Sequence, residues 1–153
     1  LTAVVTDSGG NESSATIDFV VPTGPDLQST LELLDVAQFQ GEYFTIPILL
    51  VVTNHGDKPA DPFNIVVEYV LNGFTGDPVL TIFTDKPLPA GESFSYRGEV
   101  NIFEAPGQTI SLSVVADSCA GGASPFSACL VAESNENNNR SQARDATLPS
   151  PLN

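Results

Sequence analysis

Tryptophan and methionine are absent from this sequence, and only five lysine and arginine residues stand against nineteen aspartate and glutamate residues, giving a net charge of −14. Binding to a nucleic-acid backbone needs clustered cations, so this balance excludes a nucleic-acid partner. The longest apolar run, residues 46–52, has seven residues and contains Pro47, whereas a membrane-spanning helix needs about 20. We therefore expect no membrane insertion, and we expect any export signal to lie outside this chain.

Histidine and cysteine are nearly as scarce, and this limits the chemistry. The single histidine, His55, lies in the turn-like sequence NHGD at 54–57, with no identifiable nucleophile or orienting partner. A zinc site needs a His or Cys cluster, which His55 and two cysteines do not make. The sequence also has no phosphate loop, nucleophile elbow or HExxH motif. We expect a protein that is not an enzyme.

Glycine and proline are abundant, with twelve of each between short runs rich in Val, Ile, Thr and Phe. This is an all-β composition. Residues 1–22 read as a β-hairpin around the turn SGGN at 8–11, and 23–25 as a linker. We expect residues 26–148 to form an Ig-like, seven-stranded antiparallel β-sandwich of Greek-key topology, followed by a linker at 149–153.

The alternation of apolar residues places the seven strands of this sandwich. Phe44, Ile46, Ile48, Leu50 and Val52 share one face of the second strand. The other strands are expected at about 27–36, 63–71, 79–84, 93–102, 108–116 and 143–148.

Several motifs carry a family resemblance. PDL opens the sandwich at 25–27, VTNHGD follows the second strand at 52–57, LPAGES precedes the fifth at 88–93, and VAESNENNN precedes the last at 131–139. In this order they resemble the CARDB family, the cell-adhesion-related domain found in bacteria, and the resemblance spans about residues 25–148. The loop 119–130 is enlarged relative to that family. The stretch VVTDSGGN at 4–11 is similar to the closing strands of bacterial Ig-like domains.

Cys119 and Cys129 are expected to form one disulfide, which implies an oxidising compartment. Closing an 11-residue loop in this way stabilises the fold by about 3 kcal/mol in the chain-entropy model. The alternative is two free thiols in a Gly/Ser-rich loop.

The acidic and amide residues around the last loop are the one concentration of hard oxygen ligands, and they suggest a Ca²⁺ site. The candidate ligands are Asp117, Glu133, Asn135, Glu136 and Asn138. The alternative, which we favour, is that these side chains bond local backbone groups and fix a tight turn. Ca²⁺ is the one cofactor that the sequence suggests.

Two apolar sets are candidates for contact with other domains or copies. A lone hairpin has no core, so its apolar face must be covered by another molecule or domain; that face comprises Val5, Ile17, Phe19 and Val21. Leu49, Val51, Val66 and Val70 point outward from the second and third strands. They are either a contact patch or scattered exposure.

The resemblance implies a non-enzymatic structural or adhesion module of a prokaryotic extracellular or cell-surface protein. Its partners are expected to be neighbouring domains or copies of itself, with a cell-surface protein or glycan as a further candidate. Strand complementation by the hairpin would make the chain a subunit of a surface filament. The alternative is a ligand- or carbohydrate-binding accessory domain of a secreted multidomain protein.

Overall fold

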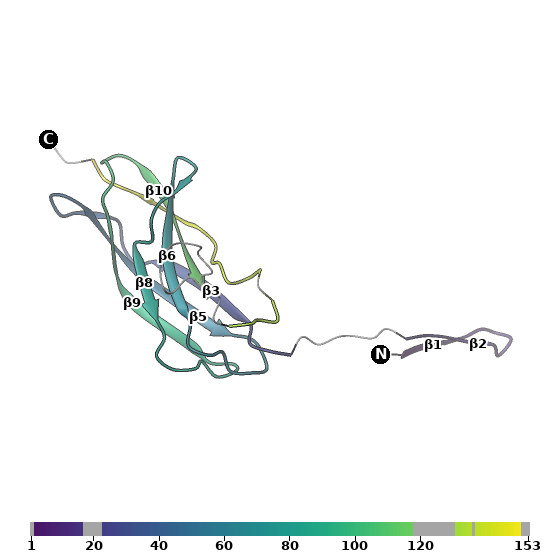
Figure 1. The fold of residues 1–153 in the computed structure, drawn as a ribbon. Coiled ribbons are helices and arrows are strands. Elements are labelled where there is room, and N and C mark those ends of the chain that lie inside the picture. The colour runs from purple at the N-terminus through teal and green to yellow at the C-terminus, as the bar shows by residue number, and fades with distance from the viewer. Residues whose placement is uncertain (1, 17–22, 118–130, 136, 151–153) are drawn as a thin grey trace.

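The computed structural model describes residues 2–16, 23–117, 131–135 and 137–150, and the regular structure in these ranges is entirely β-strand (Figure 1). No helix in the described ranges is long and apolar enough to span a membrane. The strands form a two-stranded hairpin and two larger antiparallel sheets.

The hairpin consists of β1 (Thr2–Thr6) and β2 (Glu12–Thr16), joined by a turn that Asp7 organises. The Asp7 carboxylate accepts the N–H of Gly9 at 2.8 Å, the N–H of Asn11 at 2.9 Å and the Asn11 amide at 2.9 Å. These bonds, the Asn11 amide first, hold the pKa of Asp7 below its ordinary value because they stabilise the charged form. The predicted hairpin is therefore present, while its predicted continuation over 17–22 lies outside the described residues.

The first large sheet is built around β5 (Phe44–Asn54). On one side β5 pairs with β9 (Ser93–Ile102), and on the other with β3 (Leu27–Leu33) and the short β4 (Gln38–Phe39) in succession. Among the described strands, β3 and β9 each pair with β5 alone, so they are the edge strands of this sheet.

The second large sheet contains β6 (Asn64–Leu71) beside β10 (Thr109–Ala116), with β11 (Arg144–Thr147) as the far edge strand. The other side of β6 is covered by the two-residue β7 (Phe74–Thr75) and by β8 (Leu80–Phe83). The chain thus alternates between sheets, because β5 and β9 lie in one and β6 and β10 in the other.

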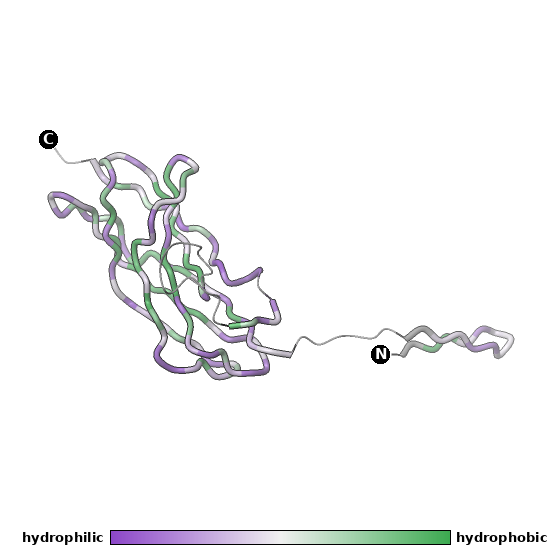
Figure 2. Tube along the Cα trace, in the orientation of Figure 1, coloured by the Kyte–Doolittle hydropathy of each residue, from purple (hydrophilic) through white to green (hydrophobic). Residues whose placement is uncertain are grey.

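The core lies between the two sheets and follows the predicted alternation. The five residues predicted to share one face of β5 are all buried, and every second residue of β10 from Ile110 to Ala116 is fully buried. Figure 2 shows hydrophobic residues along the facing strands and hydrophilic residues in many of the connecting loops. Burial of each large apolar side chain contributes about 1.5–3 kcal/mol, so this interior is the main stabilising element. The Ig-like all-β sandwich predicted from the sequence is confirmed.

Candidate functional site

Three segments far apart in the sequence meet at one end of the sandwich: residues 24–27, residues 54–57, and residues 133–135 with 137–139. We call this set the anchor knot. Asn54 lies at its centre and is fully buried. Its Oδ1 accepts the N–H of Asp26 at 3.1 Å and of Gly56 at 3.0 Å, and its Nδ2 donates to the carbonyls of Lys58 at 2.8 Å and Leu88 at 3.0 Å. One amide therefore satisfies four backbone groups, which is all that an asparagine side chain can do.

Gly56 lets the first two segments of the anchor knot approach closely. A Cβ at this position would lie 2.1 Å from the carbonyl oxygen of Gly24 and 2.7 Å from the amide nitrogen of Asp26. Asp57 then closes a reciprocal pair with Gly24: its N–H donates to the Gly24 carbonyl at 3.1 Å, and its Oδ1 accepts the Gly24 N–H at 2.7 Å. The VTNHGD motif thus holds the segment that leads into β3.

The ESNENNN segment closes over the same place from the other side. Glu133 accepts the N–H of Leu27 at 2.5 Å through Oε2 and the amide of Asn139 at 2.9 Å through Oε1. Ser134 donates its N–H to the Pro25 carbonyl at 2.9 Å, and Asn138 donates its amide to Asp26 Oδ1 at 2.7 Å. The sequence favoured bonds to local backbone groups, whereas three of these four contacts reach a segment more than 100 residues earlier in the chain. We call this set of contacts the clamp.

The other candidate calcium ligands bond to different parts of the chain. Asp117 is buried with a positive φ of 44°, and its Oδ2 accepts the N–H of Val131 at 3.0 Å. Asn135 Oδ1 accepts the N–H of Asn137 at 3.1 Å, and Glu136 lies outside the described residues. Within the described part of the chain, no three His, Cys, Asp or Glu side chains gather in a way that could hold a metal ion.

His55 is exposed on the rim of the anchor knot, where its backbone N–H donates to the Asp26 carbonyl at 2.7 Å. Cys119 and Cys129 fall in 118–130, outside the described residues, so their pairing stays a prediction. Ile17, Phe19 and Val21 are outside them too.

The outward apolar residues do not gather in one place. Leu49 and Val51 lie in β5, whereas Val66 and Val70 lie in β6, and the two strands belong to different sheets. Leu49, Val51 and Val70 are half-buried, whereas Val66 is only 5% exposed, so the predicted exposure of Val66 is wrong. Because successive side chains of a strand alternate between faces, the two pairs belong to opposite sides of the sandwich. Leu49 stands between Glu32 of β3 and Arg97 of β9.

A groove that the sequence did not predict runs along one side of the sandwich, where the edge strands β3 and β11 face each other. Its first part is about 300 Å³ and is lined by residues 28–31 together with Asn138, Arg140, Gln142 and Arg144. Its second part, of about 440 Å³, is lined by 33–37 and 145–147. The two parts abut on both walls, and we call the whole groove the lateral seam. Sequence periodicity could not reveal it, because it depends on which strands lack a partner.

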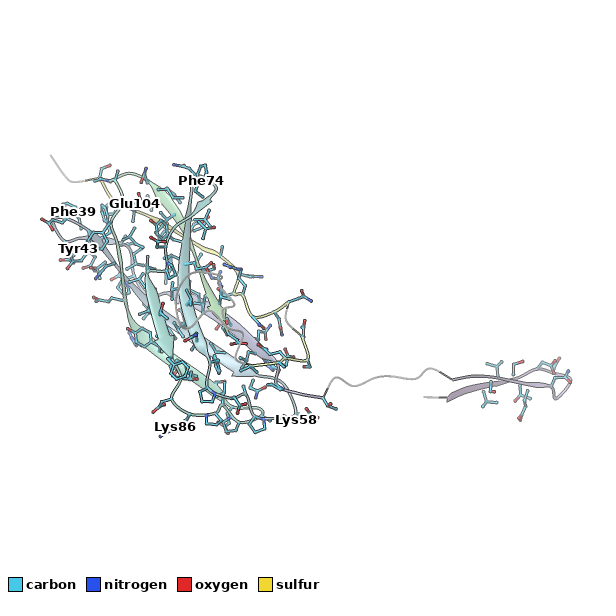
Figure 3. The ribbon with its side chains drawn as sticks, in the orientation of Figure 1. Phe39, Tyr43, Lys58, Phe74, Lys86 and Glu104 are labelled. Atoms are coloured by element: carbon cyan, nitrogen blue, oxygen red, sulfur yellow. The ribbon has the colours of Figure 1, made fainter. Side chains whose placement is uncertain are left out.

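The end of the sandwich opposite the anchor knot carries exposed aromatic side chains. Phe39, Tyr43 and Phe74 lie there together with the carboxylate of Glu104, away from Lys58 and Lys86 at the other end (Figure 3). Tyr43 packs against Phe103 with ring centroids 5.4 Å apart. Tyr69 donates its hydroxyl proton to Glu104 Oε1 at 2.6 Å, and this bond, with burial and the Glu104 charge, raises the pKa of Tyr69 to about 12.

Comparison with solved structures identifies the fold. The chain is similar to the crystal structure of the CARDB domain of a Pyrococcus furiosus protein in complex with di-metal ions, with a TM-score of 0.53 and 18% identity over 86% of this chain and 94% of that one. The solution NMR structure of that CARDB domain gives a TM-score of 0.54 and 18% identity over 83% and 97%. The chain therefore has a CARDB-like fold, as its motifs predicted. No protein-family model matches the chain, and no curated protein matches it.

Proposed function

We propose that this chain is a non-enzymatic structural module of adhesion type, carried on the outside of a prokaryotic cell. The CARDB-like fold supports this class of function. The polar side chains of the anchor knot support it as well. Asn54, Asp57 and Glu133 bond backbone groups there and so hold the fold together. A net charge of −14 suits a solvated surface protein.

We also propose that the chain assembles with further copies of itself, and this part of the proposal rests on the hairpin. Val4 and Val5 of β1 are 56% and 68% exposed, and no hydrogen bond among the described residues joins β1 or β2 to either large sheet. A two-stranded hairpin is marginal in water by itself. Its exposed valines and free edges favour pairing with another molecule, as in strand complementation. A head-to-tail contact of this kind repeats into an open filament.

Deletion of residues 1–22 tests this assembly. The intact chain is expected to form concentration-dependent assemblies detectable by static light scattering, and the truncated chain is expected to stay monomeric. Circular dichroism of the truncated chain serves as the control for folding, because the whole described hydrophobic core lies in 27–148. Equal scattering from the two proteins contradicts assembly through the hairpin.

A second candidate is a cation- or ligand-binding accessory domain, and a solved relative is the reason to keep it. The Pyrococcus furiosus CARDB domain was solved with di-metal ions. In this chain Asp117 and Glu133 are the acidic candidates among the described residues, and both already accept backbone N–H groups. Comparing the melting temperature in chelator and in millimolar Ca²⁺ tests this candidate, because binding to the native state raises the melting temperature. An unchanged melting curve would contradict Ca²⁺ binding and would leave bonding to the 24–27 segment as the role of the ESNENNN motif.

A further inference from the structure

A pocket of about 300 Å³ opens at the end of the sandwich opposite the anchor knot, and we call it the end pocket. One wall is the turn between β6 and β7, where Asn72 and Gly73 have positive φ values of 52° and 83°. Pairing across this turn places Phe74 opposite Leu71, and directly opposite residues of an antiparallel pair point to the same face. Leu71 packs against the core, so Phe74 extends that apolar face to the rim, where its ring is 80% exposed.

Glu104 lines the end pocket from the other sheet, because it lies just after β9. Its carboxylate is half-buried, and its Oε1 accepts the hydroxyl proton of Tyr69 at 2.6 Å. Gly76 makes room for the tyrosine ring, since a Cβ at this position would lie 2.5 Å from two of the ring atoms. The other oxygen of Glu104, Oε2, has no partner in the described part of the chain. Tyr69 therefore holds the carboxylate in place and leaves one of its oxygens free.

The end pocket is acidic. Among the described residues that line it, Glu104 alone carries a charge. The pKa of Tyr69 is raised by the hydrogen bond to Glu104, by burial, and by the charges of Glu104 and Asp77, so a second carboxylate adds to the negative potential here. The five lysine and arginine residues lie elsewhere: Lys58 and Lys86 at the other end of the sandwich (Figure 3), Arg97 on β9, Arg144 beside Leu31, and Arg140 beside Glu68. A pocket with charge of one sign attracts a ligand of the opposite sign, here a cation.

The remaining groups of the end pocket narrow the class of cation. Asn72 and Thr75 line it, and their side chains make no hydrogen bond within the described residues. Their oxygens and Glu104 Oε2 offer three acceptors, and a primary ammonium group has three donors and no acceptor. Leu71 and Phe74 supply the apolar surface along which the carbon stem of a lysine packs, and a cation over a ring gains further attraction. Ca²⁺ takes six to eight oxygen ligands, so this partly apolar lining fits an organic cation better than a metal ion.

We infer that the end pocket binds a primary alkylammonium group, the group that ends a lysine side chain. The ammonium donates to Glu104 Oε2 and to the oxygens of Asn72 and Thr75, while the carbon stem lies on Leu71 and Phe74. This site goes beyond the proposed structural function, and it needs neither the hairpin nor the anchor knot. It gives a role to a carboxylate that a tyrosine holds in place beside an exposed ring.

Titration of the full chain with Nα-acetyl-lysine methylamide, followed by amide NMR shifts, tests the site. Saturable shifts are expected at the amides of Asn72 and Thr75. The norleucine analogue keeps the carbon stem but lacks the ammonium group, and it is expected to bind at least about 10-fold more weakly. Glu104→Gln is expected to weaken lysine binding by a similar factor, whereas the control Glu42→Gln, at an exposed acid just before β5, is expected to change nothing. Absence of saturable binding, or equal binding by the two variants, overturns the inference.

The ring at the rim provides a second variant that keeps the charge of the pocket. Phe74→Ala is expected to weaken lysine binding about 3-fold and to leave the melting temperature unchanged, because the side chain is 80% exposed. The control is Phe83→Ala, which removes an exposed ring of β8 outside the pocket lining and is expected to leave binding unchanged. Equal binding by these two variants overturns the packing of the stem on Phe74.

Protein concentration distinguishes the sources of the lysine. A lysine of another copy shifts the Asn72 and Thr75 amides as the protein is concentrated without probe, and Lys58→Gln with Lys86→Gln abolishes those shifts. A lysine of a different protein leaves these amides independent of concentration, while the added probe still binds. Deletion of residues 1–22 is expected to leave probe binding unchanged, so a failure of hairpin assembly and a failure of the end pocket are distinguishable.

Discussion

Glu133 accepts the backbone N–H of Leu27, 106 residues earlier in the chain, at 2.5 Å, and the Asn139 amide with its other oxygen. Leu27 begins β3, and its N–H faces the edge of the sheet, where no strand in the described part of the chain accepts it. An unpaired N–H at a partly buried strand end is costly. The carboxylate therefore takes the place of a neighbouring strand and fixes where the sandwich begins.

Glu133→Gln is expected to lower the free energy of unfolding by about 1–3 kcal/mol. Glutamine keeps the shape but replaces one acceptor oxygen with a donor, which must face either the Leu27 N–H or the Asn139 amide. Urea denaturation measures the change. Glu32→Gln, at an exposed position of β3, is the control and is expected to be close to neutral. Equal effects of the two substitutions would show that the clamp adds nothing to stability.

Asn54→Ala is expected to cost about 2–4 kcal/mol, because it removes the partners of two N–H groups and two carbonyls in a fully buried place. The control is Asn101→Ala on β9, where the exposed side chain accepts only a 3.3 Å bond from Thr45. Thermal and urea unfolding of both proteins give the comparison. A loss at Asn54 no larger than at Asn101 contradicts its role as the centre of the anchor knot.

Gly56→Ala is expected to destabilise the protein by at least about 2 kcal/mol more than Gly41→Ala. The new methyl group at 56 meets backbone atoms of Gly24 and Asp26, which cannot turn aside as a flexible side chain could. Gly41 has a φ of 94° and nothing within 4 Å of a built Cβ, so its substitution carries only the left-handed backbone cost of about 1–2 kcal/mol. Similar unfolding free energies for the two variants would mean that the 24–27 segment moves away at no cost.

The sequence predicted the interior well because period-two alternation directly reports which residues share a face. The alternation of Phe44, Ile46 and Ile48 marks the buried side of β5 without any knowledge of its neighbours. Strand ends were less certain: the last strand, expected at 143–148, covers Arg144–Thr147, and β4 and β7 are too short to show a period.

Features that depend on strand pairing were beyond the same reasoning. Leu49 and Val70 were both predicted to point outward, but periodicity cannot tell that β5 and β6 lie in different sheets. The sequence predicts Asn54 to be a turn residue. It is buried at the centre of the anchor knot only because three distant segments meet around it. The lateral seam likewise lies beside the edge of β3 that pairs with no described strand. Tertiary contacts decide these points, while local patterns decide the strands.

Cys119 and Cys129 are expected to be joined in the oxidised protein. The intact mass should lie two hydrogens below that of the reduced chain, and no thiol should react with an alkylating reagent in denaturant. These are the only cysteines in the sequence, so the thiol count is direct. Replacement of both by serine is expected to cost about 3 kcal/mol. Two reactive thiols in protein purified without reductant would contradict the pairing.

Tyr69 is expected to make stability fall at alkaline pH. Its pKa is raised from 10.0 to about 12 in the folded protein, chiefly by the hydrogen bond to Glu104. Below pH 10 the phenol is protonated in both the folded and unfolded states, so the stabilisation is fully present. Between about pH 10 and 12 the unfolded chain loses this proton and the folded chain keeps it, which favours unfolding.

The Tyr69→Phe protein should lack this part of the pH dependence, and its near-ultraviolet titration should lack the step near pH 12. Glu104→Gln should move that step toward lower pH, since it removes the charge that accepts the bond. Tyr96→Phe is the control and should leave the step in place; a step near pH 12 that survives in the Tyr69→Phe protein would contradict the assignment.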